Sequence, residues 1–185
     1  MDPVISALIP GAASNVQSQI ADVLRNFGQE VLRRVADAKI LIKPLKKGER
    51  YDEVSPALRR LAIDVDAWPA PPAGLFVVEE RTVYLRSRSP MTVAHEFGHA
   101  IDCALGGGVY LSGVDLDIRR AFHAARSFVT PYAASGIDEY FAESVRAYAG
   151  VNDRSSSWPR VSKALLRRVD PSMCQIVDSL LGCAT

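Results

Sequence analysis

Two histidines and a glutamate, His95, Glu96 and His99, form the part of this chain with the clearest capacity for chemistry, in the pattern HExxH. Histidines four residues apart lie one turn apart on the same face of a helix, so both imidazoles can bind one ion. Neutral imidazole suits Zn²⁺, and a glutamate directly after the first histidine is placed to act on a water at that ion. The pattern indicates a zinc site only if it lies on a helix and a third ligand follows.

The elements around this motif are predicted to place it on a helix. Ser89-Pro90 is typical of a helix start, because serine caps the first turn and proline fits its first position. We expect the helix to run to about residue 105 and to end at the glycines that follow. Apolar segments predict strands at residues 39–43, 75–78 and 82–85, and the last two are expected to form a hairpin.

The other segments are mostly predicted helices, and the strands precede the HExxH helix. Helices are expected at residues 14–27, directly after Ser55-Pro56, and at 115–128, 138–149, 160–169 and 172–182. This order favours an α+β fold, a helix-rich single domain with a small mixed sheet, over an alternating parallel fold. The domain is expected to span residues 1–185, with N-terminal helices and the sheet in 1–89 and the zinc helix and C-terminal helices in 90–185.

Charge and hydropathy restrict the partners and the location of the protein. A net charge of +1 gives no reason to expect nucleic acid or an anionic membrane as a partner. No apolar run approaches the roughly 20 residues that a membrane helix needs. The first residues include an early aspartate, no basic stretch and a proline within the apolar run, which is a poor match to a secretory signal. We expect a monomer that is cytoplasmic, has lost a leader, or is exported without a cleaved leader.

The three cysteines are too few and too scattered for a disulfide framework or a CxxC metal site. Cys103 lies four residues beyond the second histidine of the motif and is expected to be a buried free thiol. Cys174 and Cys183 could pair in an oxidising compartment.

A third metal ligand must come from outside the HExxH segment. His123 is expected to be structural, and Asp102 is expected to accept hydrogen bonds rather than bind metal. Glu139 and Glu143 are better candidates, because four residues on a predicted helix place both on one face. One carboxylate would bind the ion, and the other would accept the free N–H of a ligating histidine. The same spacing also fits a solvated acidic helix face.

Together these segments resemble the catalytic domain of anthrax lethal factor and the bacterial Pro-Pro endopeptidases. The resemblance is carried by HEFGHAID at 95–102, EYFAE at 139–143 and the strand-turn-strand segment 74–85. It covers roughly residues 74–146, about two-fifths of the chain. The relatives are gluzincins, which are zinc endopeptidases with a zincin-like fold that use two histidines and one glutamate.

Carried over residue by residue, the resemblance implies a set of metal ligands. His95, His99 and Glu139 would bind one Zn²⁺ ion. Glu143 would lie behind the ligands and contact one of them rather than the ion.

The implied activity is hydrolysis of a peptide bond in a protein or peptide by a zinc-activated water, with Glu96 as the general base. Tyr132 stands at the family spacing, seven residues before the ligating glutamate, and would donate a hydrogen bond to the oxyanion. Residues 82–85 are the candidate edge strand on which an extended substrate could pair. The alternative is a zinc-stabilised binding or effector module that cuts no peptide. Preference for a Pro-Pro bond is left open.

Overall fold

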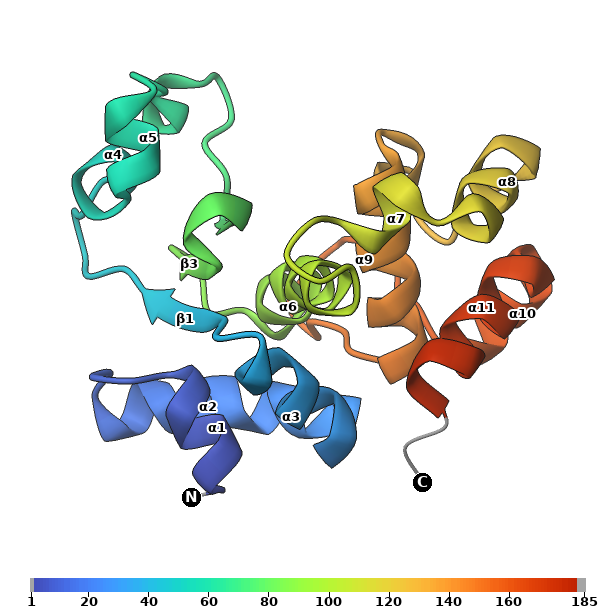
Figure 1. Ribbon diagram of the computed structural model, residues 1–185, viewed down its shortest axis with the longest axis horizontal. Coiled ribbons are helices and arrows are strands. Elements are labelled where there is room, and N and C mark those ends of the chain that lie inside the picture. The colour runs from blue at the N-terminus through green and yellow to red at the C-terminus, as the bar shows by residue number, and fades with distance from the viewer. Residues whose placement is uncertain (1, 183–185) are drawn as a thin grey trace.

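The computed structural model describes residues 2–182, in which helices surround a small sheet (Figure 1). The helix α6 lies at the centre, with α1–α3 below it, α4 and α5 to the upper left, and α8, α10 and α11 to the right. The α-helices are α1 (Pro3–Leu8), α2 (Ser14–Leu24), α3 (Gln29–Asp37), α4 (Tyr51–Val54), α5 (Pro56–Arg60), α6 (Pro90–Leu105), α7 (Leu111–Val114), α8 (Leu116–Ala124), α9 (Ile137–Ala149), α10 (Lys163–Val169) and α11 (Pro171–Leu181). Short 3₁₀ helices are η1 (Arg25–Phe27), η2 (Val65–Ala67), η3 (Val78–Glu80) and η4 (Tyr132–Ala134). Within the described residues, none of these helices has the length and apolar character that crossing a membrane requires.

Three short strands form one mixed sheet: β1 (Leu41–Pro44), β2 (Gly74–Val77) and β3 (Thr82–Leu85). The order is β1-β3-β2, with β1 parallel and β2 antiparallel to β3. The prediction that residues 82–85 form an edge strand is therefore wrong. A hairpin alone leaves both strands with a free side, and here the distant β1 pairs with the free side of β3. The sheet edge that contacts α6 is β2.

The helix that carries HExxH begins where the sequence predicts. The Ser89 hydroxyl accepts a hydrogen bond from the Thr92 amide at 3.2 Å, and Pro90 takes the first helical position. The helix packs against α2 and α3 on one side and against α9 on another. Phe97 illustrates this burial, with its ring edge-on to Phe27 at a centroid distance of 5.0 Å. Because packing holds α6 on several sides, its histidines have a rigid support.

The predicted helix 115–128 is shorter in the structure, where α8 ends at Ala124. Asp115 caps its start by accepting hydrogen bonds from the amides of Asp117 and Ile118. The chain leaves the helix so that Phe128 packs beside Tyr140 on α9, with ring centroids 5.7 Å apart.

The expectation that Cys103 is a buried free thiol is confirmed. Cys174 is also buried. Cys183 lies outside the described residues.

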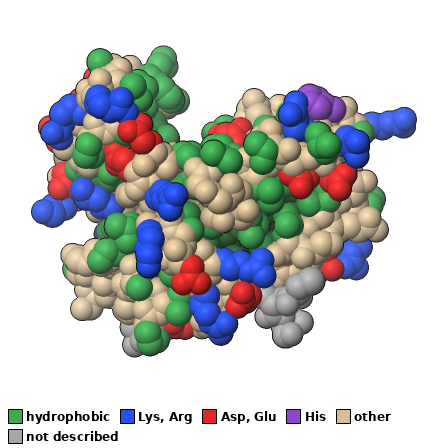
Figure 2. Space-filling view, viewed as in Figure 1, with side chains coloured by type: hydrophobic (Ala, Val, Ile, Leu, Met, Phe, Trp, Pro, Cys, Tyr) green, Lys and Arg blue, Asp and Glu red, His purple; other side chains and the backbone are tan. Residues whose placement is uncertain are grey.

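The surface is hollowed between the part that carries α4 and α5 and the part that carries α7 and α8 (Figure 2). In this view the hollow lies above α6.

The helices α6 and α9 pack closely at Gly98. A methyl group on this glycine would lie 2.8 Å from the Cα of Ala142, a backbone atom that moves only if the helices separate. We therefore expect Gly98→Ala to lower the free energy of unfolding by about 1–3 kcal/mol, although alanine favours helix. The matched control is Gly113→Ala on α7, because no atom lies within 4 Å of its added methyl group. Chemical denaturation that gives equal stabilities for the two variants would contradict this packing argument.

Candidate metal centre

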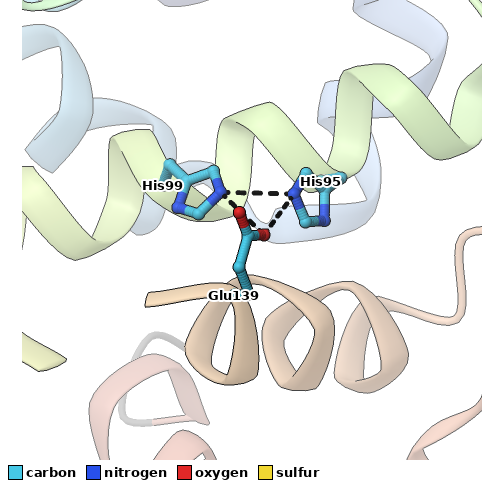
Figure 3. A group of neighbouring side chains, drawn as sticks. All are labelled: His95, His99 and Glu139. Carbon is cyan, nitrogen blue, oxygen red and sulfur yellow. Dashed lines mark hydrogen bonds and ion pairs between the residues drawn. The ribbon is translucent and has the colours of Figure 1, made fainter. Parts of the chain in front are cut away.

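The helices α6 and α9 bring His95, His99 and Glu139 together (Figure 3). The two histidine Nε2 atoms lie 3.2 Å apart. The Glu139 Oε2 atom lies 2.9 Å from Nε2 of His95 and 3.3 Å from Nε2 of His99. Each residue offers one donor atom to the same point, so the three side chains could hold a metal ion.

The spacing of these donor atoms fits a tetrahedral zinc site. Ligand atoms about 2.0–2.1 Å from a tetrahedral Zn²⁺ lie roughly 3.3 Å from one another. The observed separations are 2.9, 3.2 and 3.3 Å, two near that value and one somewhat shorter. Two imidazoles and one carboxylate leave a fourth position for water or substrate, as catalytic zinc sites do.

The hydrogen bonds of His95 also favour a positive charge between its ring and the carboxylate of Glu139. Its Nδ1 atom lies 2.9 Å from Oε1 of Glu143, and an ionised carboxylate only accepts, so Nδ1–H donates and a lone pair remains on Nε2 of neutral imidazole. That lone pair faces the carboxylate of Glu139, which is favourable only with a proton or a metal ion between them. Burial alone would lower the pKa of His95, but the carboxylates of Glu139 and Glu143 outweigh burial and raise that pKa to about 10.

Glu143 lies behind the metal donors, where four hydrogen bonds hold it. The His95 ring and the Thr130 hydroxyl each donate one bond, at 2.9 and 2.7 Å. Arg146 donates two more, both at 2.8 Å, from a side chain that is fully buried. Burial alone would raise the pKa of Glu143, but His95 and Arg146 lower it to about 2. Glu143 therefore stays ionised and orients the ring of His95.

Sequence reasoning missed Thr130 and Arg146. The signal for Arg146 was present, because an arginine three residues after a glutamate lies on the same helix face. Thr130 lies in the connection between α8 and η4, and no local pattern predicts that its hydroxyl reaches α9.

Glu96 is 7% exposed and packs against the start of β2. A methyl group on Gly74 would lie 2.5 Å from Cγ of Glu96, so this carboxylate has room only because residue 74 is glycine. Burial raises the pKa of Glu96, although the two nearby imidazoles oppose that change. The carboxylate lines a cavity of about 240 Å³ together with His95 and Tyr132.

Tyr132 lies beside the metal donors, on η4. Its hydroxyl donates a hydrogen bond of 3.0 Å to Oε1 of Glu139. Its ring centroid is 5.4 Å from that of His95. Burial first, and then the charge of Glu139, raise the pKa of the phenol well above its ordinary value, so the hydroxyl keeps its proton.

Two polar residues near the motif lie apart from the metal donors, as the sequence predicts. Asp102 is buried and accepts hydrogen bonds from the amide and hydroxyl of Ser112, at 2.8 and 2.5 Å. These bonds fasten the segment after α6 to that helix. His123 is exposed on α8, with its ring centroid 5.5 Å from that of Phe122.

Comparison with known proteins shows that this chain has a known fold. No family model and no curated protein matches the sequence. Among solved structures, the Pro-Pro endopeptidase of Paenibacillus alvei matches with a TM-score of 0.66 and 18% sequence identity, over 96% of this chain and 99% of that chain. The two chains share a fold. The helix-rich α+β fold with a small mixed sheet, expected from the sequence, is confirmed.

The metal assignment predicts different effects for the two glutamates on α9. We expect Glu139→Ala to weaken Zn²⁺ binding more than 100-fold, because it removes a donor atom, and Glu143→Ala to weaken it by about 10–100-fold. Calorimetric titration with Zn²⁺ measures both effects. Asp138→Ala is the control, because it removes an adjacent charge and lies outside the set of three donors. Zinc lost only in the Glu143 variant would exchange the roles of the two carboxylates.

Proposed function

We propose that this protein is a zinc-dependent endopeptidase. The observation that carries the proposal is the convergence of His95, His99 and Glu139 on one point, next to a cavity that His95 and the buried Glu96 both line. The fold, shared with a Pro-Pro endopeptidase, supports it. When bound, the zinc ion acts as a Lewis acid that polarises the scissile carbonyl and activates water.

Glu96 is proposed as the general base. Its carboxylate takes a proton from the attacking water and later delivers it to the leaving amine. The first transfer is helped when the pKa of the carboxyl group lies above its ordinary value, because a more basic carboxylate accepts a proton more readily, and burial raises the pKa of Glu96.

Tyr132 is proposed to stabilise the developing oxyanion. Because its phenol keeps its proton, the hydroxyl can donate to the substrate oxygen instead of to Glu139. We expect Tyr132→Phe to lower kcat by about 100–1,000-fold, the usual effect of losing one oxyanion donor, while zinc stays bound. The control is Tyr148→Phe, a tyrosine that bonds to Asp178 away from the metal donors. An unchanged kcat in steady-state kinetics of Tyr132→Phe would remove this residue from the mechanism.

The substrate is proposed to bind as an extended chain along β2. This strand begins at Gly74, which lines the same cavity as the proposed base. Within residues 2–182 no other strand pairs with the outer side of β2, so its backbone groups can form a ladder with a peptide. The solved relative makes a Pro-Pro bond the first bond to test.

The activity test is incubation of the purified protein with a peptide library, with product analysis by mass spectrometry. We expect cleavage that a zinc chelator abolishes and that added Zn²⁺ restores. A peptide series with and without adjacent prolines then measures preference for a Pro-Pro bond. A protein that binds one equivalent of Zn²⁺ and cuts no peptide would contradict the proposal and favour a zinc-stabilised binding module.

A further inference from the structure

Trp158 lies at the proposed active site, although it is distant in sequence from the motifs. It belongs to the connection between α9 and α10 and lines the same cavity as Glu96 and Tyr132. The rings of Trp158 and Tyr132 meet edge to face, with centroids 6.5 Å apart. Trp158 is 38% exposed, so part of the residue contacts protein and another part is open to a ligand.

Hydrogen bonds hold the segment that carries this tryptophan. The side-chain oxygen of Asn152 accepts from the Val161 amide at 2.8 Å, and its side-chain nitrogen donates to the Val161 carbonyl at 2.9 Å. One asparagine thus closes the loop from residue 152 to residue 161. Inside the loop, the Trp158 amide donates to the Ser156 hydroxyl at 3.0 Å. The loop has fixed ends and presents the indole at the cavity.

The cavity is lined by apolar side chains and by side chains of the proposed metal site and mechanism. Pro72, Met91 and Trp158 supply apolar side chains, and the metal donor His95 and the proposed base Glu96 line the same cavity. Its volume of about 240 Å³ is below the ~300–1,000 Å³ of pockets for drug-sized ligands, so it suits one side chain. That side chain must belong to a residue next to the scissile bond, because the proposed base lies in the same cavity.

The chemistry of the walls selects the kind of side chain. No lysine or arginine lines the described part of the cavity, and the ring of His95 already faces two carboxylates, so an acidic side chain would be buried there without a free cationic side chain. An apolar side chain would instead bury its surface against the indole and the proline ring. Because tryptophan is large and has few rotamers, it loses little entropy when it forms such a contact.

We propose that Trp158 is a specificity-determining residue, whose indole forms the wall of a subsite for an apolar side chain beside the scissile bond. The proposal rests on the peptidase function proposed above. Trp158 acts by contact with the substrate and takes no part in proton transfer or metal binding.

The test compares cleavage profiles of the zinc-loaded wild type, Trp158→Ala and Trp158→Phe on one peptide library. We expect the wild type to prefer an apolar residue at one position flanking the bond. Trp158→Ala should lower kcat/KM for the best peptide by roughly 10–100-fold, mainly through KM, and should reduce the preference at that position alone. Trp158→Phe should retain most of the preference. Zinc content and thermal stability should stay at the wild-type level in both variants.

Leu116→Ala is the control, because Leu116 is 61% exposed on α8 and outside the cavity. A wild-type profile and KM in Trp158→Ala would overturn the specificity role and leave the proposed function intact. A fall in kcat with an unchanged profile would also overturn it. If the zinc-loaded wild type cuts no peptide, the proposed function fails, and the subsite proposal fails with it.

Discussion

Glu96→Gln is expected to keep one Zn²⁺ per chain and to lower kcat by about 100–10,000-fold, the range for loss of a general base. Glutamine has the shape of glutamate, so it fits the narrow space against Gly74 without moving β2. Its amide cannot take a proton from water. The metal donors lie on His95, His99 and Glu139, so metal content should be unchanged. Steady-state kinetics and metal analysis of the same preparation measure both quantities.

The control for this change is Glu79→Gln. Glu79 is exposed and pairs with Arg60 away from the cavity, so it should keep wild-type activity and metal content. If Glu96→Gln retained near-normal kcat, another group would have to accept the proton. Loss of zinc from the variant would instead indicate that the carboxylate supports the metal.

Arg146→Met is expected to produce the largest loss of stability, about 3–5 kcal/mol in the free energy of unfolding. The arginine is fully buried and donates two hydrogen bonds to Glu143 and one, at 3.1 Å, to the Val151 carbonyl. Methionine fills most of the space but leaves the Glu143 carboxylate buried without its guanidinium partner. Because that carboxylate orients His95, zinc affinity should also fall. Denaturant unfolding and zinc titration measure the two effects.

Two further variants separate the charge from the packing. The double change Arg146→Met with Glu143→Gln should regain part of the lost stability, because it removes the unpaired charge. Arg120→Met breaks another i,i+3 pair, with Asp117, in which both side chains are about three-quarters exposed. It should change stability far less than Arg146→Met, since exposed ion pairs contribute little. Equal losses from the two arginine variants would show that burial of the pair is unimportant.

The parts of the site that the sequence predicts correctly depend on local rules. The start of α6 follows from a cap residue and a proline that are adjacent in sequence. The spacing of four residues places His95 above His99, and Glu139 above Glu143, on their helices. The approach of these pairs to one another depends on the packing of α6 against α9. For that step the sequence offers only a resemblance.

The wrong strand order and the missed Trp158 both concern contacts between residues far apart in the sequence. The order of the sheet depends on pairing between β1 and β3, about 40 residues apart, and no local pattern encodes which side of the hairpin β1 takes. Trp158 lies in a loop without periodicity, and its place at the cavity depends on how that loop folds back after α9. Arg146 is a different case, because its partners are close in sequence: arginine side chains are rarely buried, but here Glu143 and Val151 satisfy the hydrogen bonds of Arg146 in the interior.

Among the described residues, no other strand pairs with the outer side of β2, and an edge of this kind bears on self-association. An unpaired strand edge can bind any extended chain, including another copy of the same protein. The edge has only four residues, Gly74–Val77, and at about 3.3 Å per residue it spans about 13 Å. Such a short ladder is weak by itself, so a partner is held only if its side chains also fit nearby sites. Because β2 is short, its edge would bind a peptide whose side chains also fit nearby sites. The same edge would not by itself support the growth of aggregates.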